Sequence, residues 1–471
     1  MLNIVEIIRK ETKKYLQRQA VIDGNKTLTY AQLLEAVDLA SAKLKTLGVA
    51  RFNRVALLSE DSIDYIIISL AILKLFAVIV PVPFSSTPDE IKTLLKNLKV
   101  NFIIFQPGVF KPKHARALQE NLAIAQLRIK GGVAQEFYKI NPAFIRFSSG
   151  TTGVNKGVVL SHQAIQQRTS AANKGLQIKP GEQIIWVLSM SFHFVVTILL
   201  FLRRGATIIL SNRNFPQTLL QNLNQYPATF IYASPWHYHL LSSLNLPKKS
   251  LSKVRLAIST AVKLPAKIAQ EFKQKFGFQL AESYGIIEVG LPFTNTSEKI
   301  SKRGSVGKIL PDYKIKILNP DAQGRGEIHL KGKGMFNAYF FPWRSSKKIL
   351  VNGWFNTGDL GFLDQDGFLF ILGRQKQVIN FSGMKIFPFE IESLLNTHSL
   401  IKESLVYGKP HPEYGQLPVA QIVLKNNTLK INQEILNKFC YAALASYKVP
   451  KEFEFVKALS KTVSGKLKII V

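Results

Sequence analysis

The segment from Val55 to Phe105 constrains the fold most, because short apolar runs typical of strands alternate there with longer runs typical of helices. These runs are, in chain order, Val55–Leu58, Ile63–Leu75, Val78–Val82, Pro88–Leu98 and Phe102–Phe105. Such alternation predicts βαβ units and a largely parallel sheet, so we expect an α/β fold. Later short apolar runs, with helical stretches between them, repeat the pattern at Ile184–Leu188, Thr207–Leu210, Thr229–Ala233 and Leu256–Ser259.

At 471 residues, the chain is too long for one compact core. The pattern of expected strands and helices changes at two places. After Gly304, short runs such as Tyr313–Leu318 and Glu327–Leu330 predict a smaller β-rich subdomain. After Arg374, the chain has its own pattern of strands and helices. We therefore expect a large N-terminal domain over residues 1–374, with several subdomains and parallel-rich sheets, and a small α+β C-terminal domain over residues 375–471.

The charge balance is strongly basic, with 62 Lys and Arg against 30 Asp and Glu and a net charge of +32. Such an excess attracts polyanions, including nucleotides, acidic carrier proteins and anionic membrane surfaces. The basic residues are spread along the chain without a long arm, so we expect no nucleic-acid partner. Solvated lysines of a basic proteome explain the excess equally well, and peripheral membrane contact stays open.

The single cysteine, Cys440, excludes a disulfide within the chain and a cysteine-based metal site, and a cytoplasmic location is expected. The spacing in Met1–Leu16 predicts a short amphipathic helix, not a signal peptide. The most apolar window, Ile63–Val82, carries Asp64 and Lys74. We expect a buried helix and a buried strand there, not a transmembrane segment.

The segment Ser148–Gly157 has the composition of a phosphate-binding loop, with hydroxyl side chains, glycines and Lys156 close together. It lies between two expected strands, Ala143–Phe147 and Val158–Leu160. Glycines let backbone amides approach an anion, hydroxyls donate hydrogen bonds, and a lysine supplies a compact positive charge. The segment is not a Walker A loop, because Asn155 stands where that pattern requires Gly.

With this loop, the chain resembles the adenylate-forming (AMP-binding) superfamily, which includes acyl-CoA synthetases, aryl-CoA ligases and peptide-synthetase adenylation domains. Further segments resemble the motifs of that family in the same order: Thr27–Tyr30, Ala77–Pro83, Glu282–Glu288, Gly326–Ile328, Trp354–Asp359, Gly373–Lys376, Gly383–Glu392 and Ser460–Lys466. The resemblance implies an acid–thiol ligase of the acyl-CoA synthetase type. Such an enzyme joins a carboxylic acid to AMP, releases pyrophosphate, and passes the acyl group to a thiol. The expected cofactors are ATP, Mg²⁺ and coenzyme A, or the phosphopantetheine of a carrier protein.

The resemblance also assigns roles to individual residues. Those expected to bind ATP are Ser148, Ser149, Gly150, Thr151, Thr152, Gly153, Lys156, Tyr284, Gly285, Asp359 and Arg374. Glu288 is expected to hold Mg²⁺, which prefers oxygen ligands. Lys466 is expected to bridge the acid carboxylate and the α-phosphate. Lys376 is expected at the hinge of a mobile C-terminal domain, and Gly383 at the tunnel for the thiol.

His193, in Met190–Phe194, is expected near the substrate carboxylate, and Trp236 and His237 in the same pocket. The run Ser191–Phe194 lacks the Asp that holds an amino-acid ammonium, so an amino-acid substrate is disfavoured. Fatty, aryl and short branched acids all stay open. Each assignment also has a plainer reading: a core histidine, a turn-forming aspartate at 359, or a tail lysine at 466.

The sequence departs from the family pattern at three places. Asn155 replaces a Pro in the phosphate loop, and Ile287 replaces a Thr before Glu288. Ser259–Val262 replaces a Gly-rich strand end that abuts adenine, which adds the bulk of Thr260 and Val262. We therefore keep two alternatives beside the CoA ligase: an acyl-AMP ligase that loads an acidic carrier protein, and a catalytically weakened binding protein. No Lys-x-Asp-Gly motif of a nucleic-acid ligase is present.

Overall fold

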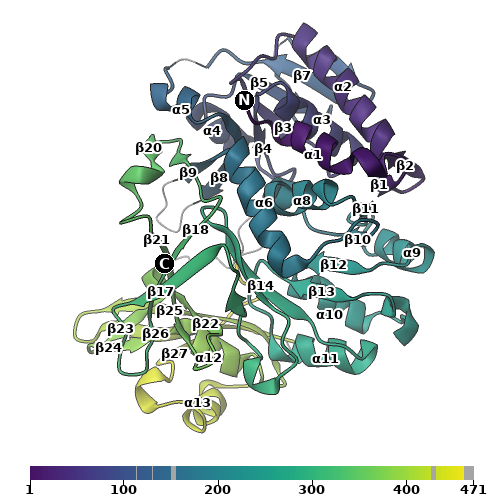
Figure 1. Cartoon of the computed structure of the whole chain (residues 1–471). Coiled ribbons are helices and arrows are strands. Elements are labelled where there is room, and N and C mark those ends of the chain that lie inside the picture. Colours follow the sequence, from purple (N-terminus) through teal and green to yellow (C-terminus); the bar gives the residue numbers. More distant parts are fainter. Residues whose placement is uncertain (113, 130, 150–154, 426–430, 461–471) are drawn as a thin grey trace. The chain divides into compact units, whose positions relative to one another are not determined.

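The computed structural model describes residues 1–112, 114–129, 131–149, 155–425 and 431–460 (Figure 1). Contacts divide the chain into two units. The first unit comprises Met1–Leu264, Ile268–Lys314 and Leu330–Phe355, and the second comprises Pro265–Lys267, Ile315–His329 and Asn356–Val471. The domain boundary expected after Arg374 stays a prediction.

Over the described residues, the first unit contains two nine-stranded mixed sheets. The strands of the first sheet are, in spatial order, β16 (Lys308–Ile309), β15 (Gly290–Asn295), β14 (Ala281–Ile286), β13 (Leu256–Ser259), β12 (Phe230–Ala233), β10 (Gln183–Trp186), β11 (Thr207–Leu210), β1 (Gln19–Asp23) and β2 (Lys26–Thr29). Its central strands, from β14 to β1, are parallel. The carboxyl ends of these strands therefore meet at one edge, where ligands bind in open α/β sheets.

The second sheet contains the region in which the βαβ pattern is clearest. Its strands are β20 (Arg344–Ser345), β19 (Ala338–Tyr339), β9 (Asn155–Ser161), β8 (Pro142–Ser149), β4 (Val78–Pro81), β3 (Arg54–Leu58), β5 (Phe102–Phe105), β7 (Leu122–Gln126) and β6 (Arg116–Gln119). The strands β8, β4, β3 and β5 are parallel neighbours. The α/β prediction is thus confirmed.

Helices cover these sheets. They are α1 (Ile4–Thr12), α2 (Tyr30–Thr46), α3 (Ile63–Lys74), α4 (Pro88–Asn97), α5 (Gln135–Lys139), α6 (His162–Leu176), α7 (Met190–His193), α8 (Leu199–Arg203), α9 (Gln217–Gln225), α10 (Pro235–Ser243) and α11 (Ala266–Phe276). The apolar helix α3 begins at its cap Ser62, whose hydroxyl accepts the Tyr65 N–H, and it is buried along its length. Within the described part of the chain, every helix is too short or too polar to span a bilayer.

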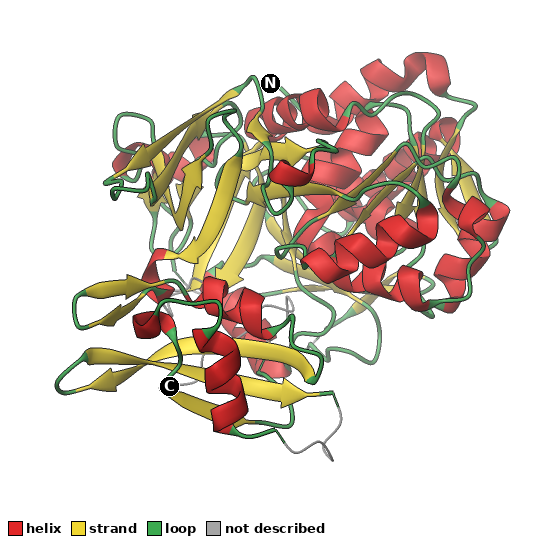
Figure 2. Cartoon of the chain, turned by 90° about the horizontal axis from the view of Figure 1, so that it is seen from below, coloured by secondary structure: helices red, strands yellow, loops and turns green. Residues whose placement is uncertain are grey.

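The second unit is α+β, as predicted (Figure 2). Most residues of a four-stranded sheet belong to this unit. The order of its strands is β17 (Tyr313–Leu318), β18 (Gly326–Gly332), β21 (Phe355–Leu363) and β22 (Leu369–Arg374). The other sheet consists of β24 (Met384–Ile386), β23 (Ile379–Phe381), β26 (Gly415–Leu424), β25 (Ile401–His411) and β27 (Glu452–Phe455). The helices α12 (Pro388–Leu395) and α13 (Gln433–Tyr441) share one core with it, which includes the buried Cys440.

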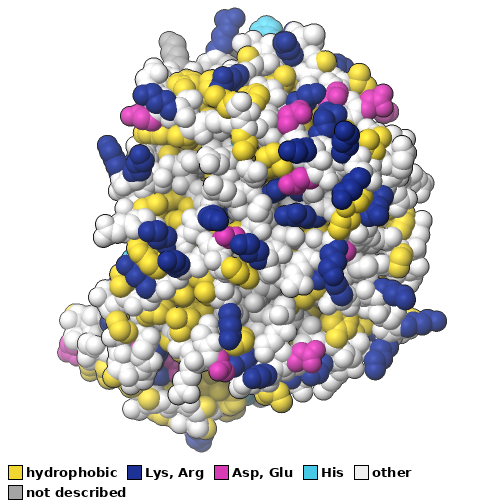
Figure 3. All heavy atoms as spheres, in the orientation of Figure 1, with side chains coloured by type: hydrophobic (Ala, Val, Ile, Leu, Met, Phe, Trp, Pro, Cys, Tyr) yellow, Lys and Arg dark blue, Asp and Glu magenta, His cyan; other side chains and the backbone are white. Residues whose placement is uncertain are grey.

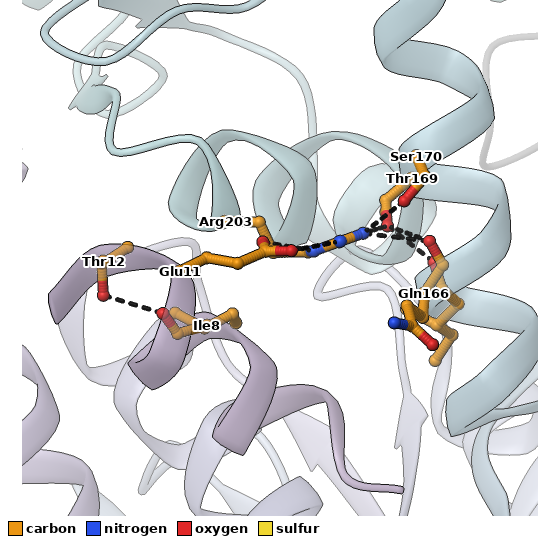
Figure 4. Close-up of polar contacts among 8 residues, drawn as sticks. Ile8, Glu11, Thr12, Gln166, Thr169, Ser170 and Arg203 are labelled. Carbon is orange, nitrogen blue, oxygen red and sulfur yellow. Dashed lines mark hydrogen bonds and ion pairs between the residues drawn. The ribbon is translucent and has the colours of Figure 1, made fainter.

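An ion pair with a buried arginine holds α1 against α8 and α6 (Figure 4). The Arg203 guanidinium, on α8, donates to both oxygens of Glu11 on α1, at 2.9 and 2.7 Å. It also donates to the Gln166 carbonyl on α6 at 2.9 Å and to the hydroxyls of Thr169 and Ser170. Because the Arg203 side chain is only 2% exposed, the charge must be paired to be tolerated.

Glu11→Ala therefore leaves a buried cation without its carboxylate. We expect the free energy of unfolding to fall by about 2–3 kcal/mol, less than for a fully buried pair because Glu11 is 30% exposed. Urea unfolding measures this loss. The control Glu6→Ala removes an exposed i,i+3 pair with Arg9 and should change stability by less than about 0.5 kcal/mol. Equal losses in the two variants would contradict this account of Arg203.

Candidate active site

The phosphate-type loop lies between two strands, β8 and β9, as predicted, and these strands pair antiparallel. The register pairs Ser148 with Lys156 and Ser149 with Asn155 at the end of the hairpin next to its loop. Residues 150–154, and with them the predicted Gly150, Thr151, Thr152 and Gly153, lie outside the described residues. Gly157 is required by packing, because a Cβ there would lie 2.6 Å from the Leu98 side chain and 3.1 Å from Phe340.

Lys156 and Glu288 both contact one tyrosine, Tyr339. The ammonium of Lys156 lies 4.7 Å from the centre of the Tyr339 ring. The hydroxyl of the same tyrosine donates to a carboxylate oxygen of Glu288 at 3.1 Å. Burial, followed by the neighbouring Glu288 charge, raises the pKa of Tyr339, so the phenol stays a donor at neutral pH. We call Lys156, Tyr339 and Glu288 the cation cluster.

Two arginines lie close enough to the cation cluster for the charge of Glu288 to act on them. Arg168, fully buried on α6, donates to the carbonyl of Ile287 at 3.0 Å and twice to the carbonyl of Gly334. Arg146, on β8, donates to the carbonyl of Phe192 at 2.9 Å. Burial lowers the pKa of each arginine to about 10, and the Glu288 charge opposes that shift. Both guanidinium groups therefore stay charged at neutral pH.

The predicted adenine-side residues lie at the end of β14. Tyr284 is half-buried, with its ring centre 6.1 Å from that of Phe293 on β15. A Cβ at Gly285 would come within 2.6 Å of the Gly290 carbonyl oxygen, so this position needs glycine for β14 to approach β15. Thr260 is buried, and its hydroxyl accepts a hydrogen bond from Tyr232 at 3.3 Å. Val262 is 48% exposed, so the packed strand end gains bulk only from Thr260.

His193 ends the short helix α7 and is half-buried. Its ring centre lies 6.1 Å from that of Trp186 and 6.2 Å from that of Tyr232, with its plane steeply inclined to both. Trp186 and Tyr232 stack on each other. His237 lies 2.7 Å from the Ser234 hydroxyl, and burial lowers its pKa to about 4, which suits a neutral helix cap. Trp236 is exposed beside it.

In the second unit, the structure brings together the predicted Asp359 and Arg374. They face each other across β21 and β22, with 2.9 Å between Nε and Oδ1. Arg374 also donates to the Thr357 carbonyl at 3.0 Å, and the Thr357 hydroxyl accepts the Asp359 N–H. Asp359 is buried, so this arginine compensates a desolvated charge.

The remaining predicted residues of the second unit lie in turns or outside the described part. Lys376 is exposed in the short 3₁₀ helix Gln375–Gln377. Gly383 lies in the tight turn between β23 and β24, where both Ser382 and Gly383 have positive φ. Lys466 lies outside the described residues, so its role stays a prediction.

Comparison with known families decides the membership of the chain. AMP-binding enzymes match residues 8–340, and the AMP-binding enzyme C-terminal domain matches residues 390–466. The chain belongs to the AMP-binding enzyme family. It is 30% identical over 481 residues to YdaB of Bacillus subtilis, an acyl–CoA ligase by name, covering 96% of this chain and 94% of that protein.

Two further relatives extend over the whole length of this AMP-binding enzyme. A long-chain-fatty-acid–CoA ligase of Yersinia pestis is 25% identical and covers 99% of this chain and 93% of its own length. The structure of o-succinylbenzoate CoA synthetase (MenE) from Bacillus subtilis, in complex with the acyl-adenylate intermediate OSB-AMP, superposes with a TM-score of 0.84 at 25% identity. The match covers 98% of this chain and 96% of the MenE chain. The expected fold class and family are thus confirmed.

The donor set of this AMP-binding enzyme suits Mg²⁺. That ion is usually bound by one or two carboxylates together with substrate phosphates and water, so Glu288 alone is sufficient. No group of three or more potential His, Cys, Asp or Glu ligands occurs among the described residues.

Sequence reasoning missed the residues that connect the motifs. Arg146 left a signal, because it interrupts the apolar run Ala143–Phe147. Tyr339 and Arg168 left none, since their roles depend on contacts with residues 51 and 119 positions away.

Tyr339→Phe should raise the KM for MgATP about tenfold, because Glu288 loses a hydrogen bond to its charged carboxylate. Initial rates at varied ATP measure this effect. The matched control is Tyr407→Phe, which removes a similar bond of 2.9 Å to Glu454 in the second unit and should leave this KM unchanged. An unchanged KM in Tyr339→Phe would contradict the role of the cation cluster.

Proposed function

We propose that this chain activates a carboxylic acid with ATP and transfers the acyl group to the thiol of coenzyme A. The observation that carries the proposal is the cation cluster at the loop end of the β8–β9 hairpin, where Lys156 and Glu288 share Tyr339. A lysine and a metal-binding carboxylate at a glycine-rich loop are the groups that a triphosphate requires.

The first half-reaction is difficult because a carboxylate is an anion and a poor electrophile. One of its oxygens attacks the α-phosphate of ATP, pyrophosphate leaves, and a mixed acyl–AMP anhydride forms. Lys156 and the amides of Ser148–Gly157 would hold the β- and γ-phosphates. Glu288 would hold Mg²⁺, which neutralises charge on the phosphate oxygens when bound. Lys466 would bridge the attacking carboxylate and the α-phosphate.

Other residues would bind the nucleoside of ATP. Tyr284 would lie against adenine, beside Gly285. Asp359 would accept hydrogen bonds from the two ribose hydroxyls, and its pairing with Arg374 keeps the buried carboxylate oriented. Lys376 would serve as the hinge and Gly383 would line the thiol tunnel in the second half-reaction, in which the thiol sulfur displaces AMP.

The acid would bind beside His193, whose ring packs against Trp186 and Tyr232. Fatty, aryl and short branched acids stay candidates, since relatives carry names that refer to long-chain fatty acids and to o-succinylbenzoate. Ile287, which lacks the expected hydroxyl, still serves the site through its carbonyl bond to Arg168. This supports an active enzyme over a weakened binding protein.

The thiol acceptor has one alternative, the phosphopantetheine of an acidic carrier protein. The net charge of +32 favours an anionic partner of either kind. On the face shown in Figure 3, lysines and arginines are scattered, with acidic side chains among them, and do not gather in one patch. Coenzyme A, a small polyanion, therefore stays our first choice. The expected cytoplasmic location stays a prediction.

Acid-dependent exchange of labelled pyrophosphate into ATP tests the function directly. A panel of acids should give exchange with at least one member and none without acid, and subsequent addition of coenzyme A should give a thioester. If none of the acids supports exchange at any concentration, the enzyme proposal is overturned. Thioester formed only on a carrier protein would favour the alternative acceptor.

Lys466→Ala should lower acid-dependent exchange at least a hundredfold, since the developing charge at the α-phosphate loses its cation. The same variant should still transfer the acyl group from a supplied acyl-adenylate. Lys468→Ala, two residues along the same tail, is the matched control and should retain exchange. Wild-type exchange in Lys466→Ala would refute the assignment.

A further inference from the structure

The helix α7 is capped by a residue far away in the sequence. Both carboxylate oxygens of Asp61 accept the backbone N–H of Met190, the first residue of α7, at 2.9 and 3.1 Å. The adjacent Ser189 makes no side-chain capping bond of its own. Asp61 therefore caps the N-terminus of α7, a role that a local Ser, Thr or Asp usually has at a helix start.

Asp61 also joins the ends of the two large sheets in the first unit. It follows β3 of the second sheet, and it accepts a hydrogen bond of 2.7 Å from Asn212, which follows β11 of the first sheet. Its side chain is almost fully buried, with the residue 7% exposed. Three backbone segments thus depend on one carboxylate.

The other end of α7 is held as well. Arg146 donates to the carbonyl of Phe192, and Thr197 donates through its hydroxyl to the carbonyl of His193 at 2.6 Å. The chain then continues as a π-helix, Phe194–Ile198, a rare element that occurs frequently at functional sites. A helix of four residues has too few hydrogen bonds to fix its own orientation, so these outside contacts decide it.

We propose that Asp61 is a positioning residue for the acid site, because it fixes the start of α7 and through it the imidazole of His193. This inference rests on the proposed function, in which His193 meets the acid. Met190 and His193 are one helical turn apart, so a rotation at Met190 displaces His193 directly. The rings of Trp186 and Tyr232 then lose their fit against the imidazole.

The surroundings of Asp61 make this contact sensitive to pH. A cavity of about 420 Å³, lined by Ser59, Ser189, Ser191 and Asn212 among others, lies beside the carboxylate and admits water. Burial raises the pKa of Asp61 to about 7, against the bonds from Met190 and Asn212 and the charge of Arg213, while Glu60 adds to the rise. Tyr65 is the other titratable group that faces it.

The direction of the pH effect follows from the acceptor count. The carboxylate accepts all three hydrogen bonds, whereas the protonated acid turns one oxygen into a donor. The hold on α7 therefore strengthens as pH rises through about 7. Stability has the opposite sign, because folding raises this pKa above its ordinary value of 3.8. The contribution of Asp61 to the free energy of unfolding falls between about pH 4 and pH 7.

The test uses the full-length enzyme and Asp61→Asn, which keeps the shape and removes the charge. We expect the KM for the acid to rise about tenfold at pH 8, with little change in the KM for ATP. Between pH 6 and pH 8, the ratio of variant to wild-type KM should increase, since only the wild type gains the carboxylate. The matched control is Asp64→Asn on the same chain segment, for which no bond to α7 occurs among the described residues.

A double-mutant cycle separates positioning from a general structural role. If Asp61 acts through His193, Asp61→Asn should have no further effect on the acid KM in a His193→Ala background. Equal effects in both backgrounds, or no effect in either, would overturn the inference. If Asp61→Asn does not fold, Asn212→Ala replaces it, because this change removes one donor to the same carboxylate. It should raise the KM for the acid by less, with the same dependence on His193. If the wild type shows no pyrophosphate exchange, the proposed function itself is refuted. If the wild type shows exchange but Asp61→Asn leaves the KM for the acid unchanged, only this inference is refuted.

Discussion

The hydrogen bond from Tyr339 to Glu288 joins the two large sheets of the first unit at the position where a triphosphate would be bound. Tyr339 belongs to β19, which pairs with β9 so that Tyr339 lies opposite Val158, two residues from Lys156. Glu288 follows β14, a strand of the other sheet. The contact therefore sets the spacing between the Lys156 ammonium and the Glu288 carboxylate, the groups that we propose for phosphate and for Mg²⁺. Neither sheet could set that spacing alone.

Buried charge makes this arrangement rigid. Arg168 anchors the backbone at Ile287, the residue before Glu288, and at Gly334. Arg146 reaches from the strand before the loop to the segment that carries His193. A buried guanidinium is costly unless its donors are satisfied by carbonyls or carboxylates. These arginines thus favour one packing of strands and helices around the site, as Arg203 does for α1.

The strands could be predicted from the sequence because their apolar runs are short and their boundaries carry polar or turn residues. Thr207–Leu210 and Leu256–Ser259 have the predicted bounds, while Val78–Val82 ends one residue early, at Pro81. The motif residues Lys156, Glu288, Asp359 and Arg374 could be identified from a family resemblance. Tyr339, Arg168 and Asp61 could not, because their partners are determined by how the two sheets pack. A single sequence without pairs of varying positions carries no signal of that packing.

The central claim is that the cation cluster binds the triphosphate of ATP together with Mg²⁺, and that Asp359 binds the ribose of the nucleotide. Dissociation constants for AMP and for a non-hydrolysable ATP analogue with Mg²⁺, measured by titration calorimetry, test it most directly. Asp359→Asn should weaken both ligands by about tenfold or more, because both contain the ribose, whereas Glu288→Gln should weaken only the ATP analogue. Unchanged AMP binding in Asp359→Asn, or equal weakening of both ligands in Glu288→Gln, would contradict the account.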